Sequence, residues 1–157
     1  DPIDLTKRLA VALAIGLLVG LERGWIQRHE KEGERALGLR TLGLSGLLGG
    51  AAGAIAITVP AAGAPLLAVT FAVYGASIAL LRYREMVREQ TLGTTTIVAA
   101  LLTFVLGAMA VMVDPLIASA GGVAVAGLLA TKPALHGWMA RLTWEELRAA
   151  LVLLTMR

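Results

Sequence analysis

Long apolar blocks separated by short charged segments make up most of this chain. The blocks cover residues 5–21, 39–59, 65–83, 93–113 and 115–131. Each is close to the roughly 20 predominantly apolar residues that an α-helix needs to cross a bilayer. The pattern therefore predicts an all-α fold, a polytopic transmembrane bundle with about five spanning helices and the lipid bilayer as its surroundings.

Two prolines mark predicted helix starts. A proline suits the first turn of a helix, where its missing N–H would be unpaired in any case. Pro65 is therefore predicted to begin the third span, and Pro115 the fifth. Asp114 stands directly before Pro115, where its carboxylate is placed to cap the fifth helix after a very tight turn.

The pattern changes after the fifth block. Apolar and polar side chains mix there with tryptophan, which is typical of a short helix lying at the membrane interface. Thr143 and Glu146 then form a capping box, which predicts a new helix. Too few residues follow it to cross a bilayer, so we expect the start of a sixth, truncated span. The predicted units are a five-helix transmembrane domain, an interfacial connector and the start of a further span: residues 1–131, 132–142 and 143–157.

Basic residues lie mainly in the first and third loops. The first loop holds Arg23, Arg28, Lys31 and Arg35, and the third holds Arg82, Arg84 and Arg88. Because cytoplasmic loops carry an excess of Lys and Arg, these loops are predicted to be cytoplasmic and the N-terminus to lie outside. The predicted location is the cytoplasmic (inner) membrane.

The composition narrows the function classes. Hydrophobic residues make up 57% of the chain, and cysteine is absent, which excludes a thiolate nucleophile or a cysteine metal cluster. The net charge of +3 falls between apolar blocks rather than on a solvated face, which argues against nucleic-acid binding. No dinucleotide or phosphate-binding glycine loop occurs in the sequence. We therefore expect no enzyme activity, no catalytic residue, no cofactor and no structural metal.

Glycines repeat at four-residue spacing in the first two blocks. Gly16, Gly20 and Gly24 form one such series, and Gly46 with Gly50 forms another. Small residues at this spacing let two helix backbones approach closely in lipid. The first two helices are therefore predicted to pack tightly against each other.

Ionisable residues stand at the predicted membrane ends of these two helices. Glu22 and Arg23 follow the first block, and Arg40 opens the second. Since the two helices are antiparallel, Glu22 is a plausible partner for Arg40. Two interpretations stay open: an ion pair that locks the hairpin, or a site that binds an ion or small solute.

Hydroxyl groups supply the remaining candidate polar side chains. Thr94, Thr95 and Thr96 open the fourth block, where they either cap the helix or line a polar cavity, and Thr41 follows Arg40. Ser45 lies inside the second span and is expected to form hydrogen bonds between helices.

Several motifs resemble one membrane-protein family. Gly20-Leu21-Glu22-Arg23, a polar loop and Gly38-Leu39-Arg40-Thr41 before a glycine-rich helix are similar to the N-terminal membrane domain of the MgtC/SapB family. The segments Thr94-Thr95-Thr96 and Lys132-Pro133 with His136 resemble its larger subgroup, in which a second membrane half of unknown function follows. The resemblance implies an acidic residue directly after these threonines, where this chain has Ile97.

The resemblance leaves two function hypotheses. Family members are often described as magnesium transporters, whereas others look like regulators of neighbouring membrane proteins. In the first hypothesis, the chain is the N-terminal half of a transporter for an ion, with Mg²⁺ as a candidate, or for a small solute. A second membrane half or a homo-oligomer would complete it. In the second hypothesis, it is a scaffold that binds and regulates another membrane protein.

Overall fold

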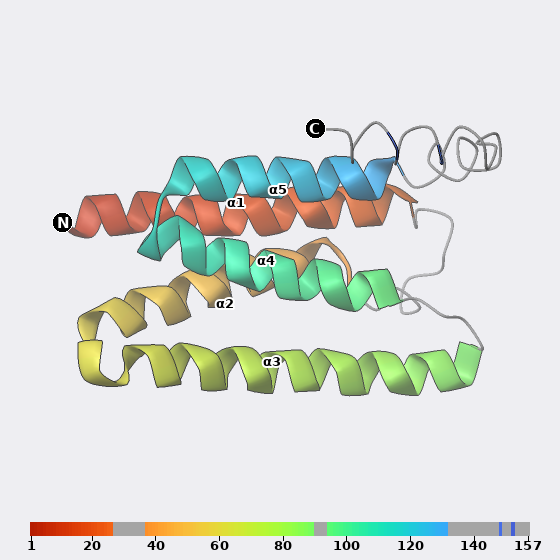
Figure 1. Cartoon of the computed structure of the whole chain (residues 1–157), viewed down its shortest axis with the longest axis horizontal. Helices are drawn as coiled ribbons and strands as arrows, with labels where there is room; N and C mark the ends of the chain where they lie inside the picture. The colour runs from red at the N-terminus through yellow and green to blue at the C-terminus, as the bar shows by residue number, and fades with distance from the viewer. Residues whose placement is uncertain (27–36, 90–93, 132–147, 149–151, 153–157) are drawn as a thin grey trace.

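The computed structural model describes residues 1–26, 37–89 and 94–131, together with the single residues 148 and 152. Its elements are α1 (Pro2–Ile26), α2 (Leu39–Thr58), α3 (Pro60–Glu89), α4 (Thr94–Met112) and α5 (Pro115–Ala130). Successive helices run in opposite directions along one long axis (Figure 1). The predicted all-α bundle is confirmed; the predicted connector and sixth span lie outside the described ranges, apart from those two single residues.

Three of the helices are long and apolar enough to cross a membrane: α2, residues 61–84 of α3, and α4. The sequence predicts five spans. Helices α1 and α5 are not among the three, and each for a separate reason. Helix α1 carries charges near both ends, so only residues 9–21 are free of them. Helix α5 is apolar but has 16 residues, about 24 Å at the usual rise, which is shorter than a typical bilayer core.

Helices α2 and α4 occupy the centre of the bundle. Each packs against the other and against α1 and α3, while α5 covers α1 and α4. Figure 1 shows α3 along one side and α1 with α5 along the other. The largest fully buried side chains come from α1, α2 and α4: Phe104, Leu42, Val19 and Thr103.

Glycines allow the central backbones to touch. A Cβ at Gly16 would collide with the Leu42 carbonyl of α2, and one at Gly20 would stand 2.8 Å from the Leu39 Cα. Gly46 faces the Ala12 carbonyl of α1, and the close approach predicted for the first two helices is present.

The same α2 surface also contacts α4, which the sequence pattern did not predict. Gly49 lies against the Phe104 backbone, and Gly107 of α4 lies against the Gly46 carbonyl. The Gly50 site is close to both neighbours, since a Cβ there would be 2.9 Å from the Ala12 Cβ and 3.4 Å from the Gly107 carbonyl. Helix α2 is thus held between two helices by glycine contacts on two of its faces.

Two glycines differ from what the sequence predicts: Gly24 is predicted to pack between helices, and Gly63 lies before the predicted start of the third span. Among the described residues, nothing lies within 4 Å of the position of a Gly24 Cβ, so Gly24 does not continue the packing series. It lies four residues beyond Gly20, which packs on the first residue of α2. At Gly24, α1 therefore extends beyond the start of α2. Conversely, Gly63 is buried in α3 against the Ala56 carbonyl.

Helix α3 begins earlier than predicted, at Pro60 rather than Pro65. A single residue, Val59, separates it from α2, and the Ala62 N–H bonds to the Val59 carbonyl at 3.0 Å. Pro65 lies inside the helix. Alanine is the strongest helix former, and the alanine-rich segment before Pro65 together with the Gly63 contact accounts for the extra turn.

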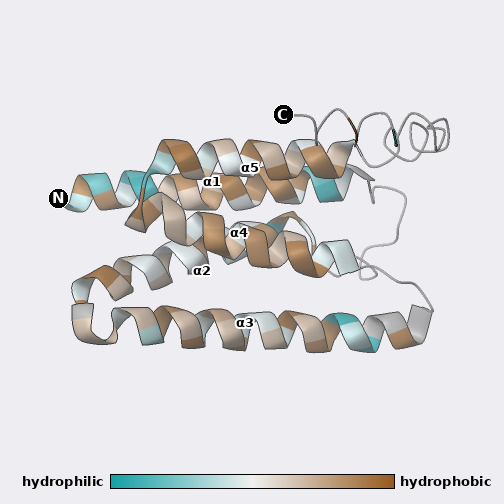
Figure 2. Cartoon of the chain, viewed as in Figure 1, coloured by the Kyte–Doolittle hydropathy of each residue, from teal (hydrophilic) through white to brown (hydrophobic). Residues whose placement is uncertain are grey.

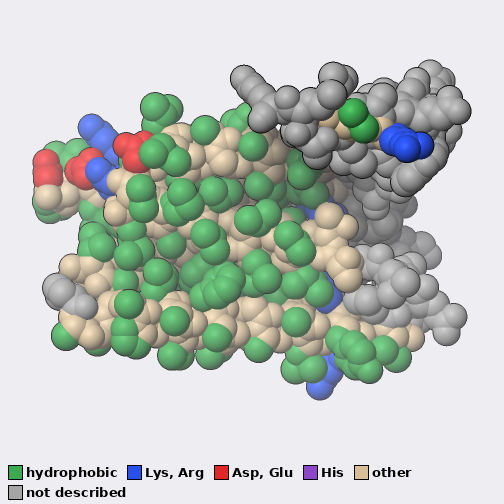
Figure 3. Space-filling model, in the orientation of Figure 1, with side chains coloured by type: hydrophobic (Ala, Val, Ile, Leu, Met, Phe, Trp, Pro, Cys, Tyr) green, Lys and Arg blue, Asp and Glu red, His purple; other side chains and the backbone are tan. Residues whose placement is uncertain are grey.

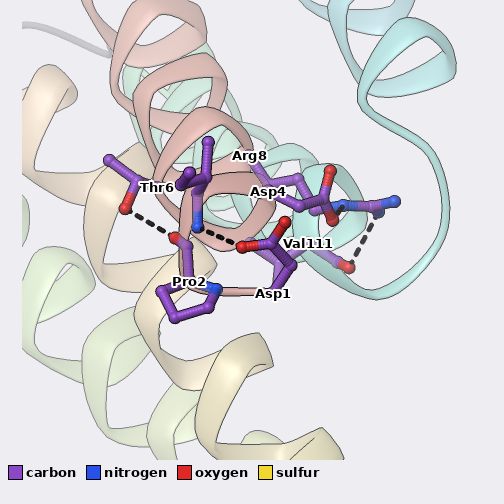
Figure 4. A network of polar contacts seen from close by, with 7 residues as sticks. Asp1, Pro2, Asp4, Thr6, Arg8 and Val111 are labelled. Atoms are coloured by element: carbon purple, nitrogen blue, oxygen red, sulfur yellow. Dashed lines mark hydrogen bonds and ion pairs between the residues drawn. The ribbon is translucent and has the colours of Figure 1, made fainter.

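Polar contacts fasten the end of the bundle where α1 begins, which we call the Arg8 end. Arg8 binds the Asp4 carboxylate at 2.8 Å and donates from Nη1 to the Val111 carbonyl, in the last turn of α4, at 3.2 Å (Figure 4). Asp114 accepts hydrogen bonds from the Leu116 and Ile117 N–H groups at 2.8 and 3.0 Å. The predicted cap before Pro115 is therefore confirmed.

The middle of the bundle surface is hydrophobic. Figure 2 shows apolar residues along the middle of the helices and hydrophilic ones towards their ends. On the face shown in Figure 3, the described charged side chains gather at the two ends of the bundle. Helix α3 is the most exposed span, since only 6% of its apolar window is buried, against 50% for α2 and 56% for α4.

Helix α3 docks on the centre through a few aromatic and polar contacts. The Tyr74 hydroxyl donates to Ser45 Oγ of α2 at 2.6 Å, so Ser45 forms the interhelical bond expected of it. The Tyr74 ring stacks on Phe104 of α4 with centroids 5.3 Å apart, and Phe71 lies against the same ring at 5.5 Å. These contacts fix which face of α3 turns inward.

The glycine contacts predict a difference between two sites in one helix. Gly16→Ala should destabilise the bundle by about 2 kcal/mol, because the new methyl group collides with the backbone of α2. Gly24→Ala should be neutral or stabilising by up to about 1 kcal/mol, since alanine favours helix and has free space there. Unfolding in detergent would measure both variants, and equal losses would show that Gly16 has no packing role.

Candidate functional site

Charged side chains are buried at the opposite end of the bundle, which we call the Arg23 end. Helix α1 contributes Glu22 and Arg23, whose side chains are only 9% and 15% exposed. Arg23 Nε lies 4.0 Å from Glu22 Oε2, within reach of electrostatic attraction but too far for a hydrogen bond. The two residues therefore form a loose ion pair rather than a closed salt bridge.

Two further residues complete this site. Arg23 Nη1 donates a hydrogen bond to Thr96 Oγ1, in the first turn of α4, at 3.3 Å. Arg82 of α3 is 9% exposed, and its positive charge is close enough to act on that of Arg23. We refer to Glu22, Arg23, Arg82 and Thr96 as the buried charge cluster. Three helices thus contribute one carboxylate, two guanidinium groups and one hydroxyl.

The helical period explains why Glu22 points inward. It follows Ile15 and Val19 at seven- and three-residue spacing, and both of these are buried. Gly20, which faces α2, is two residues from Glu22 and so lies about 200° around the helix. Glu22 therefore faces the bundle interior, away from the contact with α2.

Arg82 points inward for the same reason, although the sequence pattern predicts it only as a basic loop residue. Tyr74, Ile78 and Arg82 are spaced four residues apart, so they lie on one face of α3. Tyr74 packs on α4, and Ile78 is 6% exposed. Arg82 extends this inward-facing stripe by one turn, and that continuity is the signal that could have found it.

The expected pairing of Glu22 with Arg40 was wrong. Arg40 is exposed at the start of α2, and neither Glu22 oxygen accepts a hydrogen bond from the described residues. The reason is geometric: α2 meets α1 on the Gly20 face, whereas Glu22 lies on the opposite side. The neighbour of Glu22 is Arg23 instead.

The predicted polar cluster is only partly assembled. Thr96 is buried and joins the site, but Thr94 and Thr95 are exposed. Thr41 is also exposed and contributes only its carbonyl, which accepts from Ser45 Oγ at 2.7 Å. Arg23 and Thr96 are thus the two members of the predicted supporting set that meet.

Polar atoms in the cluster are not fully satisfied by the described residues. Both Glu22 oxygens lack a hydrogen-bond partner among them, as do Nε and Nη2 of Arg23. Burying such groups without partners is costly, more so in an apolar bundle than at a wet surface. This end of the bundle therefore has capacity to bind a polar group.

The charges of the cluster do not favour direct metal coordination. Within the described parts of the chain, no three His, Cys, Asp or Glu side chains are close enough together to hold a metal ion. Glu22 is the carboxylate of the cluster, Arg23 stands beside it, and the charge of Arg82 acts on that of Arg23. A bare divalent cation at this position would be repelled by Arg23 and Arg82.

An apolar cavity of about 610 Å³ lies elsewhere, between α2, α3 and α4. Ala56, Gly63, Phe71 and Met112 are among the residues that line it, and no member of the buried charge cluster does. Its lining suits hydrocarbon rather than an ion. The cavity and the cluster are thus separate features of the bundle.

The profile of the MgtC family matches residues 9–138. The chain belongs to the MgtC family. The match includes the four residues of the buried charge cluster, and in this MgtC family protein Ile97 packs against the apolar core next to it. No curated protein and no solved structure matches the chain. The assignment to the larger subgroup with a second membrane half stays a prediction.

Two arginines in this MgtC family protein should respond differently to neutralisation. Arg23→Gln leaves the buried Glu22 carboxylate without its cationic neighbour, so we expect a loss of about 3 kcal/mol in unfolding free energy. Arg40→Gln removes an exposed charge and should change stability by less than about 0.5 kcal/mol. Denaturant unfolding in detergent would compare them, and a larger loss for Arg40→Gln would place the structural ion pair at Arg40 after all.

Proposed function

We propose that this protein is the N-terminal half of a membrane transporter for an ion or small solute, and that it is not an enzyme. The observation that carries the proposal is the buried charge cluster at one end of an apolar helix bundle. Ionisable groups at membrane depth are costly, and where they face a bundle interior they usually mark a solute or ion pathway.

The position of the cluster supports a role at a pathway entrance. Its members come from the end of α1, the end of α3 and the start of α4, so they meet at one end of the bundle, towards a membrane surface, rather than at its centre. Magnesium is the ion that the family resemblance suggests. With the Arg23 guanidinium beside Glu22, Mg²⁺ would have to keep its water shell or bind elsewhere in the complete protein.

Topology is part of the proposal. We place the Arg8 end outside and the Arg23 end in the cytoplasm of a bacterial or archaeal cell, because Arg23, Arg82 and Arg84 all belong to the Arg23 end. The buried charge cluster would then face the cytoplasm.

Cysteine labelling tests this orientation. Val59→Cys, in the turn between α2 and α3, should react with a membrane-impermeant maleimide applied to intact cells. Thr94→Cys, exposed at the start of α4, should react only after the cells are opened. Because the native chain has no cysteine, the background is low. Reaction of Thr94→Cys in intact cells would reverse the proposed topology.

A regulatory scaffold is the second candidate function. The observation that favours it is the exposed α3 span, which leaves an apolar surface free for lipid, a second membrane half, another copy of the chain or a different membrane protein. A scaffold needs such a surface but does not need a buried charge cluster.

Flux measurements separate the two functions. Full-length protein in liposomes should transport an ion or small solute, tested with Mg²⁺ and with small anions, and Arg82→Gln should reduce the rate at least about tenfold if the cluster lies on the pathway. Arg84→Gln is the matched control, since Arg84 is an exposed arginine on the same helix. Absence of flux for every solute, with both variants folded, would favour the scaffold.

A further inference from the structure

The apolar cavity between α2, α3 and α4 lies in the half of the bundle nearest the Arg8 end. Its lining on α3 runs from Gly63 to Phe71, and its lining on α4 runs from Phe104 to Val113. At the usual rise of an α-helix, these two segments are about 12 and about 14 Å long. Half of the hydrocarbon core of a bilayer is about 15 Å thick. The cavity therefore extends over about the depth of one leaflet.

The sequence of α3 explains why space is left there. Gly63, Ala64 and Ala68 line the cavity, and Phe71 and Tyr74 follow on the same side of the helix at three- and four-residue spacing. The inward side chains of α3 are thus small in its first turns and large further along. The large ones reach α4, whereas the small ones leave a gap of about 610 Å³, within the range of pockets that hold small organic molecules.

The cavity ends at a group of aromatic rings. Phe71 and Phe104 both line it, and their ring centroids are 5.5 Å apart. Tyr74, the next residue on this side of α3, stacks on Phe104 at 5.3 Å and lies outside the described lining. These rings join α3 to α4 about halfway along α3. An occupant that enters from the membrane surface at the Arg8 end therefore stops near the middle of the bilayer.

The cavity opens sideways, between α3 and α4. Its floor includes the buried residues Ala56 and Ala108, whereas Ala68, Val105 and Met112 at its rim are exposed. The described lining residues are all apolar, so water in the cavity would find few polar partners. The cavity is therefore open to the hydrocarbon of the surrounding bilayer.

The closed inner end decides between two kinds of occupant. A transmembrane helix of another protein could not stop in the middle of the bilayer, because the polar backbone groups at its end would have no partners. An acyl chain has no polar group along this depth, and it ends in a methyl group near the middle of the bilayer. The depth, the side opening and the aromatic end of the cavity all suit an acyl chain.

We propose that this cavity is a binding site for an acyl chain of a phospholipid in the leaflet at the Arg8 end. The chain lies between α3 and α4, with its terminal methyl group against Phe71 and Phe104 and its ester end near Val113. It fills the space that the small residues of α3 leave, and so it stabilises the packing of α3 on α4. This site is separate from the buried charge cluster and does not depend on the transport function.

Photoreactive phospholipids test the position of the chain. Full-length protein in nanodiscs is irradiated with phosphatidylcholine that carries a diazirine either next to the terminal methyl group or near the ester end of one acyl chain. Peptide mass spectrometry should find the first label on Phe71 or Phe104 and the second on Met112 or Val113. Val73 is the internal control, since it is 62% exposed on the other side of α3 at the depth of Phe71.

A pair of alanine variants tests whether the cavity itself holds the lipid. Ala68→Phe places a ring in the cavity, whereas Ala72→Phe places one at an exposed position of α3 one turn further on, outside the described lining. Native mass spectrometry of the full-length protein from mild detergent measures how much phospholipid stays bound. Ala68→Phe should reduce the bound fraction about tenfold, because displacing even two methylene groups costs about that much affinity. Ala72→Phe should leave it unchanged.

Three outcomes would overturn the proposal. Equal retention of phospholipid by Ala68→Phe and Ala72→Phe would mean that the lipid binds elsewhere on the bundle. Preferential labelling of Val73 by the terminal diazirine would place the chain on the outer surface of α3. A change of oligomeric state in Ala68→Phe with lipid retention unchanged would assign the cavity to a side chain of a second copy. The labelling of the native protein decides the matter by itself if Ala68→Phe does not fold.

Discussion

The contact of three backbones at Gly46 is the constraint on which the rest of the bundle depends. Gly46 faces the Ala12 carbonyl of α1, and its own carbonyl faces Gly107 of α4. Between helices in lipid there is little hydrophobic driving force, so close van der Waals packing must hold them together. By setting α1 and α4 at short distance, this contact also brings Arg23 within reach of Thr96 at the far end of the same helices.

The buried charge cluster is costly for a bundle of this kind. Its side chains follow directly on apolar ones, since Val19 and Ile78 lie one turn before Glu22 and Arg82 and belong to the same hydrophobic core. Nothing in the apolar packing requires charge there. Leucine at these positions would extend both stripes, so the apolar packing alone does not account for the three ionisable groups.

The fold was largely predictable because its signal is local. Apolar blocks, the Asp114 cap and the four-residue glycine spacing each depend on neighbours in sequence, whereas the α2–α4 contact depends on which faces of two helices meet.

The site was less predictable for the same reason. Glu22 and Arg40 seemed natural partners because each ends a helix at one loop, but pairing is decided by direction around the helix axis. Following the buried stripes through Val19 and Ile78 identifies Glu22 and Arg82 as inward-facing members of the cluster, while the ion-pair neighbour of Glu22 is Arg23.

The one-residue turn at Val59 fixes the start of α3 but not the angle between α3 and α2. Because a single residue joins it to α2, the start of α3 is held next to the end of α2. Arg82 lies about 33 Å along the helix from Pro60 at 1.5 Å per residue. A pivot of about 5° therefore displaces Arg82 by about 3 Å, the length of a hydrogen bond. A small difference in the angle between α2 and α3 would therefore change the distance from Arg82 to the residues of α1.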